Sequence, residues 1–264
     1  MTFMNDWTEK LFIERPEIFL KLMNQRWART EELVNGMVKI LKDHGITSGR
    51  PLDLCCGNGR ISVHMAKRGF RTVGVDMSPT FLEDAKRKAD ENGVSDMTSF
   101  LHGDVRKLKN VIGKIAKPFD VVVDVWTSIG FSSPEDDLKV FKQARELARS
   151  GAILFIAETT HNDYISLKFF PTSYEEVDGL VLLENRTFDP TRSMMRTTWS
   201  FYEKQQRNLI FIDKADLALH VYSVSELSTL LRRSGWEPVA FYGNLTTLQP
   251  MSALTRMDLV AKAS

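Results

Sequence analysis

The sequence lacks an excess of charge of either sign. Across 264 residues, 35 lysines and arginines stand against 34 aspartates and glutamates, so the formal net charge is +1. Proteins that bind nucleic acid mainly through phosphate contacts usually carry a marked basic excess. The balance therefore argues against a general nucleic-acid binder, and binding to RNA or DNA would need a local basic face.

Cysteines and long hydrophobic runs are also scarce. The two cysteines, Cys55 and Cys56, are adjacent, so they cannot link distant segments and they lack the spaced partners of a zinc site. The longest apolar runs, such as 121–123 and 153–157, have the length of strands, far short of the about 20 residues that a membrane-spanning helix needs. The N-terminal region lacks the apolar core of a signal peptide. We therefore expect a reduced, cytoplasmic protein with no metal site and no membrane segment.

What the sequence does contain is typical of an α/β protein. With 43% hydrophobic and 26% charged residues, it has enough apolar surface to offset the entropy lost on folding. Apolar residues at helical spacing predict an N-terminal helical cap over residues 1–48. Over 49–161 and again over 223–264, short strands alternate with helices, which predicts a doubly wound, mostly parallel seven-stranded sheet with helices on both faces. The strands are expected at 51–55, 72–75, 98–101, 119–125, 152–157, 238–242 and 258–261.

Residues 162–222 interrupt this alternation. Two stretches with strand-like periodicity, 180–188 and 193–203, flank a turn signal at 189–192. Two shorter strands are expected at 209–212 and 217–222. The segment therefore predicts an antiparallel insertion of three or four strands after strand five. It is rich in tyrosine, tryptophan and phenylalanine, and we expect most of these rings in the core and the others in the wall of a substrate pocket.

The sharpest motif is the turn that follows the first predicted strand. Asp53 lies in the strand, and Gly57 and Gly59 follow in a turn before a helix. Glycine lets a ligand approach the backbone closely and adopts a positive φ without strain, and a strand–turn–helix unit of this kind indicates a nucleotide-binding site. A pyrophosphate at the helix N-terminus would be repelled by Asp53, whereas a cationic ligand would be attracted.

Together with three later motifs, this turn makes the sequence resemble the class I S-adenosylmethionine-dependent methyltransferases, which have a Rossmann-like fold. The first motif of that family is an acid followed by a Gly-x-Gly turn, matched here by Asp53, Gly57 and Gly59. The other motifs end the next predicted strands, at residues 73–78, 101–105 and 119–131. The resemblance covers 50–161 and 223–263, and it implies that the cofactor is S-adenosyl-L-methionine. The antiparallel insertion resembles the lid-like sheet of small-molecule N-methyltransferases, so we expect it to serve as a substrate lid.

The resemblance also implies contacts with the adenosine part of the cofactor. Asp76, at the end of strand two, would bind both ribose hydroxyls, and Met77 would pack on the adenine. Asp104, at the end of strand three, would accept a hydrogen bond from the adenine amino group. The backbone amide of Val105 would donate to the adenine ring.

At the methionyl end, the resemblance places the acid and the glycine turn of the first motif against the ammonium and sulfonium groups. Cys55 and Cys56 stand where the family usually has smaller residues; we expect both to be packing residues, with Cys55 against the cofactor. Trp126, after the fourth strand, is expected at the same site. In similar methyltransferases a leading helix closes the site, and Arg29 or Arg26 would then bind the cofactor carboxylate.

The methyl acceptor is expected beyond the ends of strands four and five. Asp124 lies near the end of the fourth strand, Glu158 ends the fifth, and His161 follows in the loop. Each is a candidate base for the nucleophile, because open α/β sheets place their ligands at this edge. Ordinary loop residues share this position, so a surface acid and a solvated histidine are the alternative interpretations.

These features predict a methyltransferase that transfers a methyl group to an N or O nucleophile of a small molecule by direct in-line displacement. RNA methylation is the alternative, and it would need a basic stripe at the cofactor mouth, such as Lys107, Lys109, Lys114 and Lys117. A protein that binds S-adenosylmethionine without turning it over would carry the same motifs. A hydride-transferring dehydrogenase is a further alternative, and it would bind nicotinamide. The oligomeric state is left open.

Overall fold

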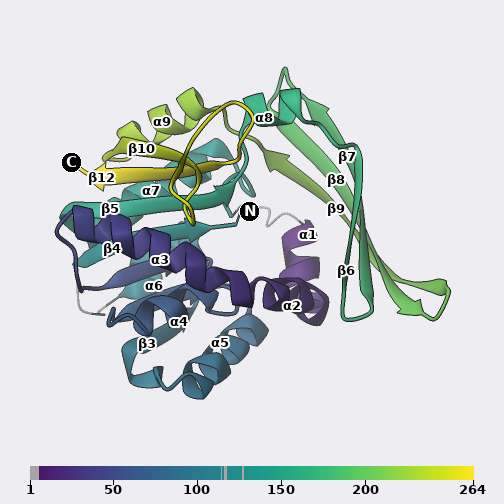
Figure 1. Cartoon of the computed structure of the whole chain (residues 1–264), viewed down its shortest axis with the longest axis horizontal. Coiled ribbons are helices and arrows are strands. Elements are labelled where there is room, and N and C mark those ends of the chain that lie inside the picture. The colour runs from purple at the N-terminus through teal and green to yellow at the C-terminus, as the bar shows by residue number, and fades with distance from the viewer. Residues whose placement is uncertain (1–5, 114, 116–117, 127) are drawn as a thin grey trace.

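A computed structural model of the chain describes residues 6–113, 115, 118–126 and 128–264. Figure 1 shows an α/β core and a separate curved sheet, with the N-terminal helices between them. The core contains an eight-stranded sheet in the order β11-β10-β12-β5-β4-β1-β2-β3. The structure therefore confirms the predicted α/β class with an added antiparallel sheet.

The strands of the large sheet run mainly in one direction. Their bounds are β1 (Pro51–Leu54), β2 (Thr72–Asp76), β3 (Thr98–His102), β4 (Phe119–Val125), β5 (Ala148–Thr159), β10 (Trp236–Asn244), β11 (Gln249–Pro250) and β12 (Met257–Ala263). The strands β1 to β5 are parallel, whereas β12, β10 and β11 pair antiparallel. The sheet has one strand more than predicted, because β11 is a two-residue strand that pairs with β10 in a region expected to be loop.

Helices cover both faces of this sheet, as the alternation of strands and helices predicts. They are α3 (Trp27–Asp43), α4 (Arg60–Ala66), α5 (Pro79–Glu91), α6 (Leu108–Ile112), α7 (Pro134–Leu147) and α9 (Val224–Arg233), with short 3-10 turns at η2 (Ser95–Met97) and η3 (Val105–Lys107). Along β4, Val121 and Val123 pack towards α3 and α4, whereas Val122 packs towards α6, α7 and α9. Among the helices of the described ranges, none has the length and apolar character needed to cross a bilayer.

The N-terminal segment is helical over most of its described part. Its two longer helices are α2 (Pro16–Gln25) and α3, which meet at Arg26. Pro16 occupies the first turn of α2, where its missing N–H has no helical partner to lose. A short α1 (Asp6–Glu9) and a π-helical turn η1 (Lys10–Glu14) precede it.

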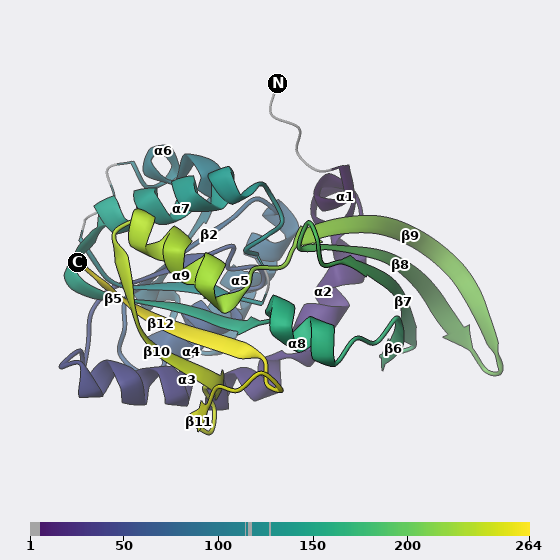
Figure 2. The ribbon, with the colours of Figure 1, turned by 90° about the horizontal axis from the view of Figure 1, so that it is seen from above.

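The insertion is a four-stranded antiparallel sheet in the order β6-β7-β8-β9, which Figure 2 shows curving away from the core. Its strands are β6 (Thr172–Val177), β7 (Leu180–Asp189), β8 (Met194–Gln205) and β9 (Asn208–His220), preceded by α8 (Asn162–Leu167). The predicted turn at 189–192 connects β7 to β8. The prediction of two short strands at 209–212 and 217–222 is wrong, because β9 is continuous; β6 and α8 were not predicted.

Candidate functional site

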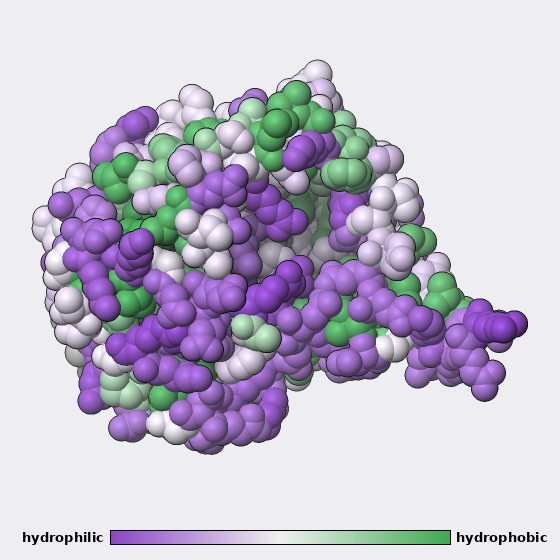
Figure 3. All heavy atoms as spheres, in the orientation of Figure 1, coloured by the Kyte–Doolittle hydropathy of each residue, from purple (hydrophilic) through white to green (hydrophobic). Residues whose placement is uncertain are grey.

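A cavity of about 490 Å³ lies at the carboxyl ends of the parallel strands. Its walls come from the loops after β1 to β5, from the helices α1 and α2, and from the face of β6–β9 that is turned towards them. Figure 3 shows the surface hollowed between the core and the antiparallel sheet, with hydrophilic side chains on both sides of the hollow. This edge of an open α/β sheet is where ligands bind, and the volume is typical of a small-molecule site.

The loop after β1 forms one side of the cavity. Its backbone turns sharply, with φ of 53° at Gly57 and 73° at Gly59. Asp76, at the end of β2, fixes this loop because its carboxylate accepts hydrogen bonds from the Gly57 amide at 2.8 Å and the Ser78 amide at 2.9 Å. A Cβ on Gly57 would lie 2.8 Å from the sulfur of Met23 in α2. The glycine therefore allows the N-terminal helix to approach the loop closely.

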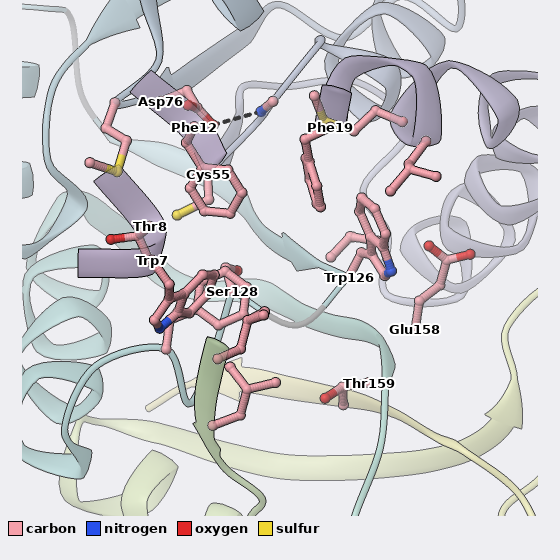
Figure 4. Close-up of a pocket in the computed structure, with 18 of the residues that line it drawn as sticks. Trp7, Thr8, Phe12, Phe19, Cys55, Asp76, Trp126, Ser128, Glu158 and Thr159 are labelled. Atoms are coloured by element: carbon pink, nitrogen blue, oxygen red, sulfur yellow. Dashed lines mark hydrogen bonds between the residues drawn. The ribbon is translucent and has the colours of Figure 1, made fainter. Parts of the chain in front are cut away.

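Three non-glycine residues at the cavity have left-handed backbone conformations. The φ angle is 52° at Cys55 after β1, 69° at Trp126 after β4 and 55° at Glu158 near the end of β5. All three line the cavity, and Figure 4 shows Cys55 near Asp76 on one side and Trp126 near Glu158 on the other. Such conformations are strained for side-chain-bearing residues and concentrate at functional sites.

The carboxylates on the side of β2 and β3 differ in their surroundings. Burial raises the pKa of Asp76, although its backbone hydrogen bonds oppose the change. The pKa of Asp104 lies below its ordinary value. Partial burial alone would raise this pKa, but the hydrogen bonds from Arg106 lower it by more. Arg106 Nε lies 2.9 Å and 3.0 Å from the two carboxylate oxygens. A ligand at Asp104 would therefore share the carboxylate with Arg106.

On the side of β5, Glu158 is held by charged and backbone partners. Its Oε2 accepts a hydrogen bond from Nη2 of Arg60 at 2.6 Å, and its backbone N–H donates to Asp258 at 2.6 Å. Arg60 is buried in the first turn of α4 and also donates to Thr30. The loop after β1 and the end of β5 are thereby joined by one ion pair beneath the cavity.

Aromatic rings close the cavity from the N-terminal side. Phe19 of α2 stacks between Trp126 of the core and Trp199 of β8, with ring centroids 5.1 Å and 5.8 Å apart and interplanar angles of 16° and 18°. The guanidinium carbon of Arg26 lies 4.0 Å from the centre of the Trp126 ring, and Arg26 Nη1 lies 3.7 Å from Glu175 of β6. Helix α2 therefore contacts both the core and the insertion at the cavity.

Nine of the residues singled out from the sequence come together around this cavity. They are Arg26, Cys55, Gly57, Asp76, Met77, Asp104, Val105, Trp126 and Glu158. Cys55 is exposed to the cavity although protein surrounds it, and burial together with nearby aspartates raises the pKa of its thiol. Cys55 therefore stays a neutral thiol. Within the described ranges, no group of three or more histidine, cysteine, aspartate or glutamate side chains is arranged to hold a metal ion.

The other predicted site residues lie outside the lining. Asp53 is buried and accepts from the amide and the hydroxyl of Ser62, the latter at 2.7 Å; burial raises its pKa to about 7. Gly59 packs against Ala85 and Phe100. Asp53 and Gly59 thus support the glycine turn, and their direct contact with a cofactor stays a prediction.

Asp124, His161 and Arg29 also stand back from the cavity. Asp124 is buried behind Ser128, whose hydroxyl donates to it and itself lines the cavity. His161 is not a solvated loop residue: it is fully buried, its Nε2 lies 2.9 Å from the Thr255 carbonyl, and its Nδ1 caps α8. Arg29 is exposed on α3, whereas Arg26, the other arginine considered, lines the cavity.

Several lining residues were missed by sequence reasoning. Three on neighbouring insertion strands, Glu175, Glu184 and Arg186, face the cavity. Glu184 and Arg186 lie two positions apart on β7, and this spacing indicates that their side chains share one face of the sheet. Arg256 lies in a loop with no motif. Two buried lining atoms, Trp7 Nε1 and Thr160 Oγ, have no hydrogen-bond partner among the described residues.

The basic stripe that RNA binding would need is only partly described. Lys109 forms an ion pair with Glu146 at 2.6 Å, so its charge is locally balanced. Lys107 lies in the turn after β3. Lys114 and Lys117 lie outside the described residues.

Several known proteins that resemble the chain in sequence are named as methyltransferases. Residues 52–151 match the family model described as a methyltransferase domain. YqeM of Bacillus subtilis (strain 168), whose name assigns it provisionally as a methyltransferase, is 33% identical over 127 residues, 47% of each chain. The 23S rRNA (uracil(1939)-C(5))-methyltransferase RlmD of Shewanella sp. (strain ANA-3) is 43% identical over 146 residues, 51% of this chain and 31% of RlmD. The chain therefore spans about half or less of these relatives.

Solved structures share the fold over most of the chain. A S-adenosylmethionine-dependent methyltransferase from Clostridium acetobutylicum ATCC 824 superposes with a TM-score of 0.74 at 14% identity, covering 88% of this chain and 91% of that one. CalS10, an amino pentose methyltransferase from Micromonospora echinaspora whose structure has S-adenosylmethionine bound, superposes with a TM-score of 0.68 at 15% identity. The superposition covers 89% of this chain and 92% of CalS10. At these identities the likeness concerns the fold.

Proposed function

We propose that this protein, which contains a class I S-adenosylmethionine-dependent methyltransferase domain, transfers a methyl group from S-adenosyl-L-methionine to an N or O nucleophile of a small molecule. The observation that carries this proposal is a single cavity with two differently built sides. The ends of β1, β2 and β3 offer the motif residues of a cofactor site. The ends of β4 and β5, with the face of β6–β9 opposite them, enclose room for an acceptor.

The residues of the first side fit the cofactor chemically. Asp76 presents a buried carboxylate for the ribose hydroxyls, and Met77 and Val105 offer apolar surface and a backbone amide for the adenine. Arg26, whose pKa is lowered mainly by burial, is placed to bind the cofactor carboxylate. The Trp7 N–H, which has no hydrogen-bond partner among the described residues, is a further donor for a bound molecule. A cavity of about 490 Å³ accommodates a ligand of this size.

The chemistry needs alignment more than covalent help from the protein. When bound, S-adenosylmethionine supplies a methyl group on a positive sulfonium, which a nucleophile attacks from the opposite side. The cavity residues would hold the two partners in line, and the stacked rings of Phe19, Trp126 and Trp199 would exclude water from the reacting atoms.

A proton acceptor is available near the acceptor side. Ser128 lines the cavity and donates its hydroxyl to Asp124, whose pKa burial raises to about 7. A carboxylate with this pKa can take up a proton near neutral pH. Asp124 would therefore act through Ser128 to hold an amine or hydroxyl nucleophile in its reactive form, whereas Glu158 is already committed to Arg60.

A small molecule suits the enclosed acceptor side better than RNA. The cavity is walled by α2, by the ends of β4 and β5 and by the face of β6–β9, and its volume of about 490 Å³ is typical of a small-molecule site. The amino pentose methyltransferase CalS10 resembles 89% of the chain in fold. RNA remains the second candidate because the RNA methyltransferase RlmD resembles about half of the chain in sequence.

The first prediction concerns the cofactor. Asp76→Ala is expected to weaken S-adenosylmethionine binding by about 1–3 kcal/mol, because a charged hydrogen-bond acceptor is lost. Isothermal titration calorimetry measures the change, with circular dichroism confirming that the variant is folded. Asp43→Ala, at an exposed acid on α3, is the matched control. Unchanged affinity in folded Asp76→Ala would refute the placement of the cofactor.

The second prediction concerns the acceptor. Incubation with methyl-labelled S-adenosylmethionine and a fractionated cell extract should place label in the low-molecular-weight fraction, and at a limiting cofactor concentration the labelling should be reduced with Asp76→Ala. Label in the RNA fraction, with transfer that falls steeply as salt rises, would support the RNA alternative instead. Cofactor binding with no labelled product in any fraction would contradict an enzymatic function.

A further inference from the structure

We propose that the methyl acceptor carries an anionic group, a carboxylate or a phosphate, and that Arg256 and Arg186 bind this group on the acceptor side of the cavity. The inference rests on the proposed function and specifies the class of its substrate. It depends on two arginines from distant parts of the sequence that meet at one wall. Arg186 lies on β7, and Arg256 lies in the loop just before β12.

Among the arginines that line the cavity, Arg256 forms no ion pair within the described part of the chain. Its side chain is exposed and lines the cavity, and no hydrogen bond or ion pair joins it to any described residue. The nearest acid along the chain, Asp258, feels the charge of Arg256 but does not pair with it directly. Its Oδ1 accepts from the Glu158 amide at 2.6 Å and its Oδ2 from the Leu245 amide at 2.7 Å. The Arg256 guanidinium therefore keeps its donors free for a ligand.

Arg186 is already partly engaged but remains close to Arg256. Its Nη2 contacts Glu184, and its Nη1 donates to the Ser173 hydroxyl at 2.9 Å. Burial lowers the pKa of Arg186, and the nearby charge of Arg256 lowers it further. Of the two guanidinium groups in this wall, only Arg186 pairs directly with a carboxylate, that of Glu184. Asp258 interacts with Arg256 only through space, so no hydrogen-bonded anion balances the Arg256 guanidinium among the described residues.

The acids of the acceptor side cannot supply that balance. Glu158 is paired with Arg60, Glu175 lies near Arg26, and Glu184 is paired with Arg186. A carboxylate or phosphate of the substrate matches the planar fork of a guanidinium and binds it through charge-assisted hydrogen bonds. Binding such a group would fix the acceptor against the insertion while its nucleophile lies at the donor side.

The test uses inorganic phosphate and acetate as probes of the full-length protein. The protein is first saturated with S-adenosylhomocysteine, so that the anions cannot bind at Arg26 in the cofactor half. Each anion is then titrated at constant ionic strength while the arginine Nε–H resonances are followed by NMR. We expect saturable shifts in the wild type and a dissociation constant weakened by about tenfold or more in Arg256→Gln, since a charge-assisted contact is removed. Arg186→Gln should weaken binding in the same direction.

Arg196→Gln is the matched control, because Arg196 is an exposed arginine on the neighbouring strand β8 that does not line the cavity. It should bind both anions as the wild type does. Tighter binding of phosphate would identify a phosphorylated acceptor, and tighter binding of acetate a carboxylate. Equal anion binding by Arg256→Gln and wild type, or no saturable shift in the wild type, would overturn the proposal.

Cofactor binding separates this proposal from the proposed function. If S-adenosylhomocysteine binds normally to the wild type and to Arg256→Gln while anion binding is absent from both, only the anionic acceptor is overturned. If S-adenosylhomocysteine fails to bind to the wild type, the proposed methyl transfer fails first.

Discussion

Replacing Phe19 with alanine is expected to lower the free energy of unfolding by about 3–5 kcal/mol, the usual cost of removing a buried phenylalanine ring. Phe19 is 7% exposed and stacks on Trp126 and Trp199, which belong to different parts of the fold. Its ring therefore joins α2, the core and the insertion at one point. Its loss would leave a void beside the cavity and expose the reacting groups to water.

Urea denaturation followed by circular dichroism measures this effect, with hydrogen exchange of the α2 amides as a local readout. Phe19→Leu keeps most of the volume and should cost less than about 1.5 kcal/mol. Phe170→Ala, at a 63% exposed ring, should change stability by no more than about 0.5 kcal/mol. If Phe19→Ala behaves like Phe170→Ala in both measurements, α2 does not depend on this stack.

Asp124→Asn is expected to change how stability depends on pH. Burial raises the pKa of Asp124 to about 7 in the folded protein, whereas an unfolded aspartate has a pKa of about 3.9. Between these values the folded protein holds a proton that the unfolded chain has released. Stability due to this group therefore falls as pH rises from about 4 to about 7, by up to about 1.4 kcal/mol for each pH unit.

The asparagine variant cannot titrate at this position, so its stability relative to the wild type should rise with pH across that window. The total change should be about 3–4 kcal/mol, and the difference should be constant above about pH 8. Asparagine keeps an oxygen that can accept the hydrogen bond from Ser128. Any remaining difference in stability that does not depend on pH leaves the slope, which is the quantity tested, unchanged. Asp43→Asn, at an exposed acid, should show no such slope. If the difference in free energy of unfolding between Asp124→Asn and the wild type does not change with pH, Asp124 is not a buried carboxyl that is protonated in the folded protein.

The strands and turns of the core could be predicted because the residues that end the strands and form the turns act locally. The turn at Gly57 and the strand-ending Asp76 and Asp104 are set by glycine conformation and by carboxylates that cap the following loops. The insertion was harder to predict. The prediction broke β9 near Asp213 and Asp216, because aspartate is a poor strand former. In the fold Asp213 pairs with Lys10 at 2.7 Å and Asp216 accepts from Thr198 at 2.6 Å, so the strand continues.

The site was predicted where the backbone defines it and missed where side chains from distant segments pair. Arg29 and Arg26 lie on one predicted helical segment, and the break at Arg26 decides which of them reaches the cavity. At that break Arg26 lies near Glu175 of β6, a tertiary contact that the local sequence pattern does not encode. Arg256 and Arg186 are likewise brought together by tertiary structure alone.

The most direct test of this account is a crystal structure of the protein with S-adenosylhomocysteine. The account predicts the ribose hydroxyls within hydrogen-bond distance of Asp76, the homocysteine carboxylate at Arg26, and the sulfur directed towards the space between Trp126 and the face of β6–β9. A product bound elsewhere, or with its sulfur directed away from that space, would contradict the placement of donor and acceptor in one cavity.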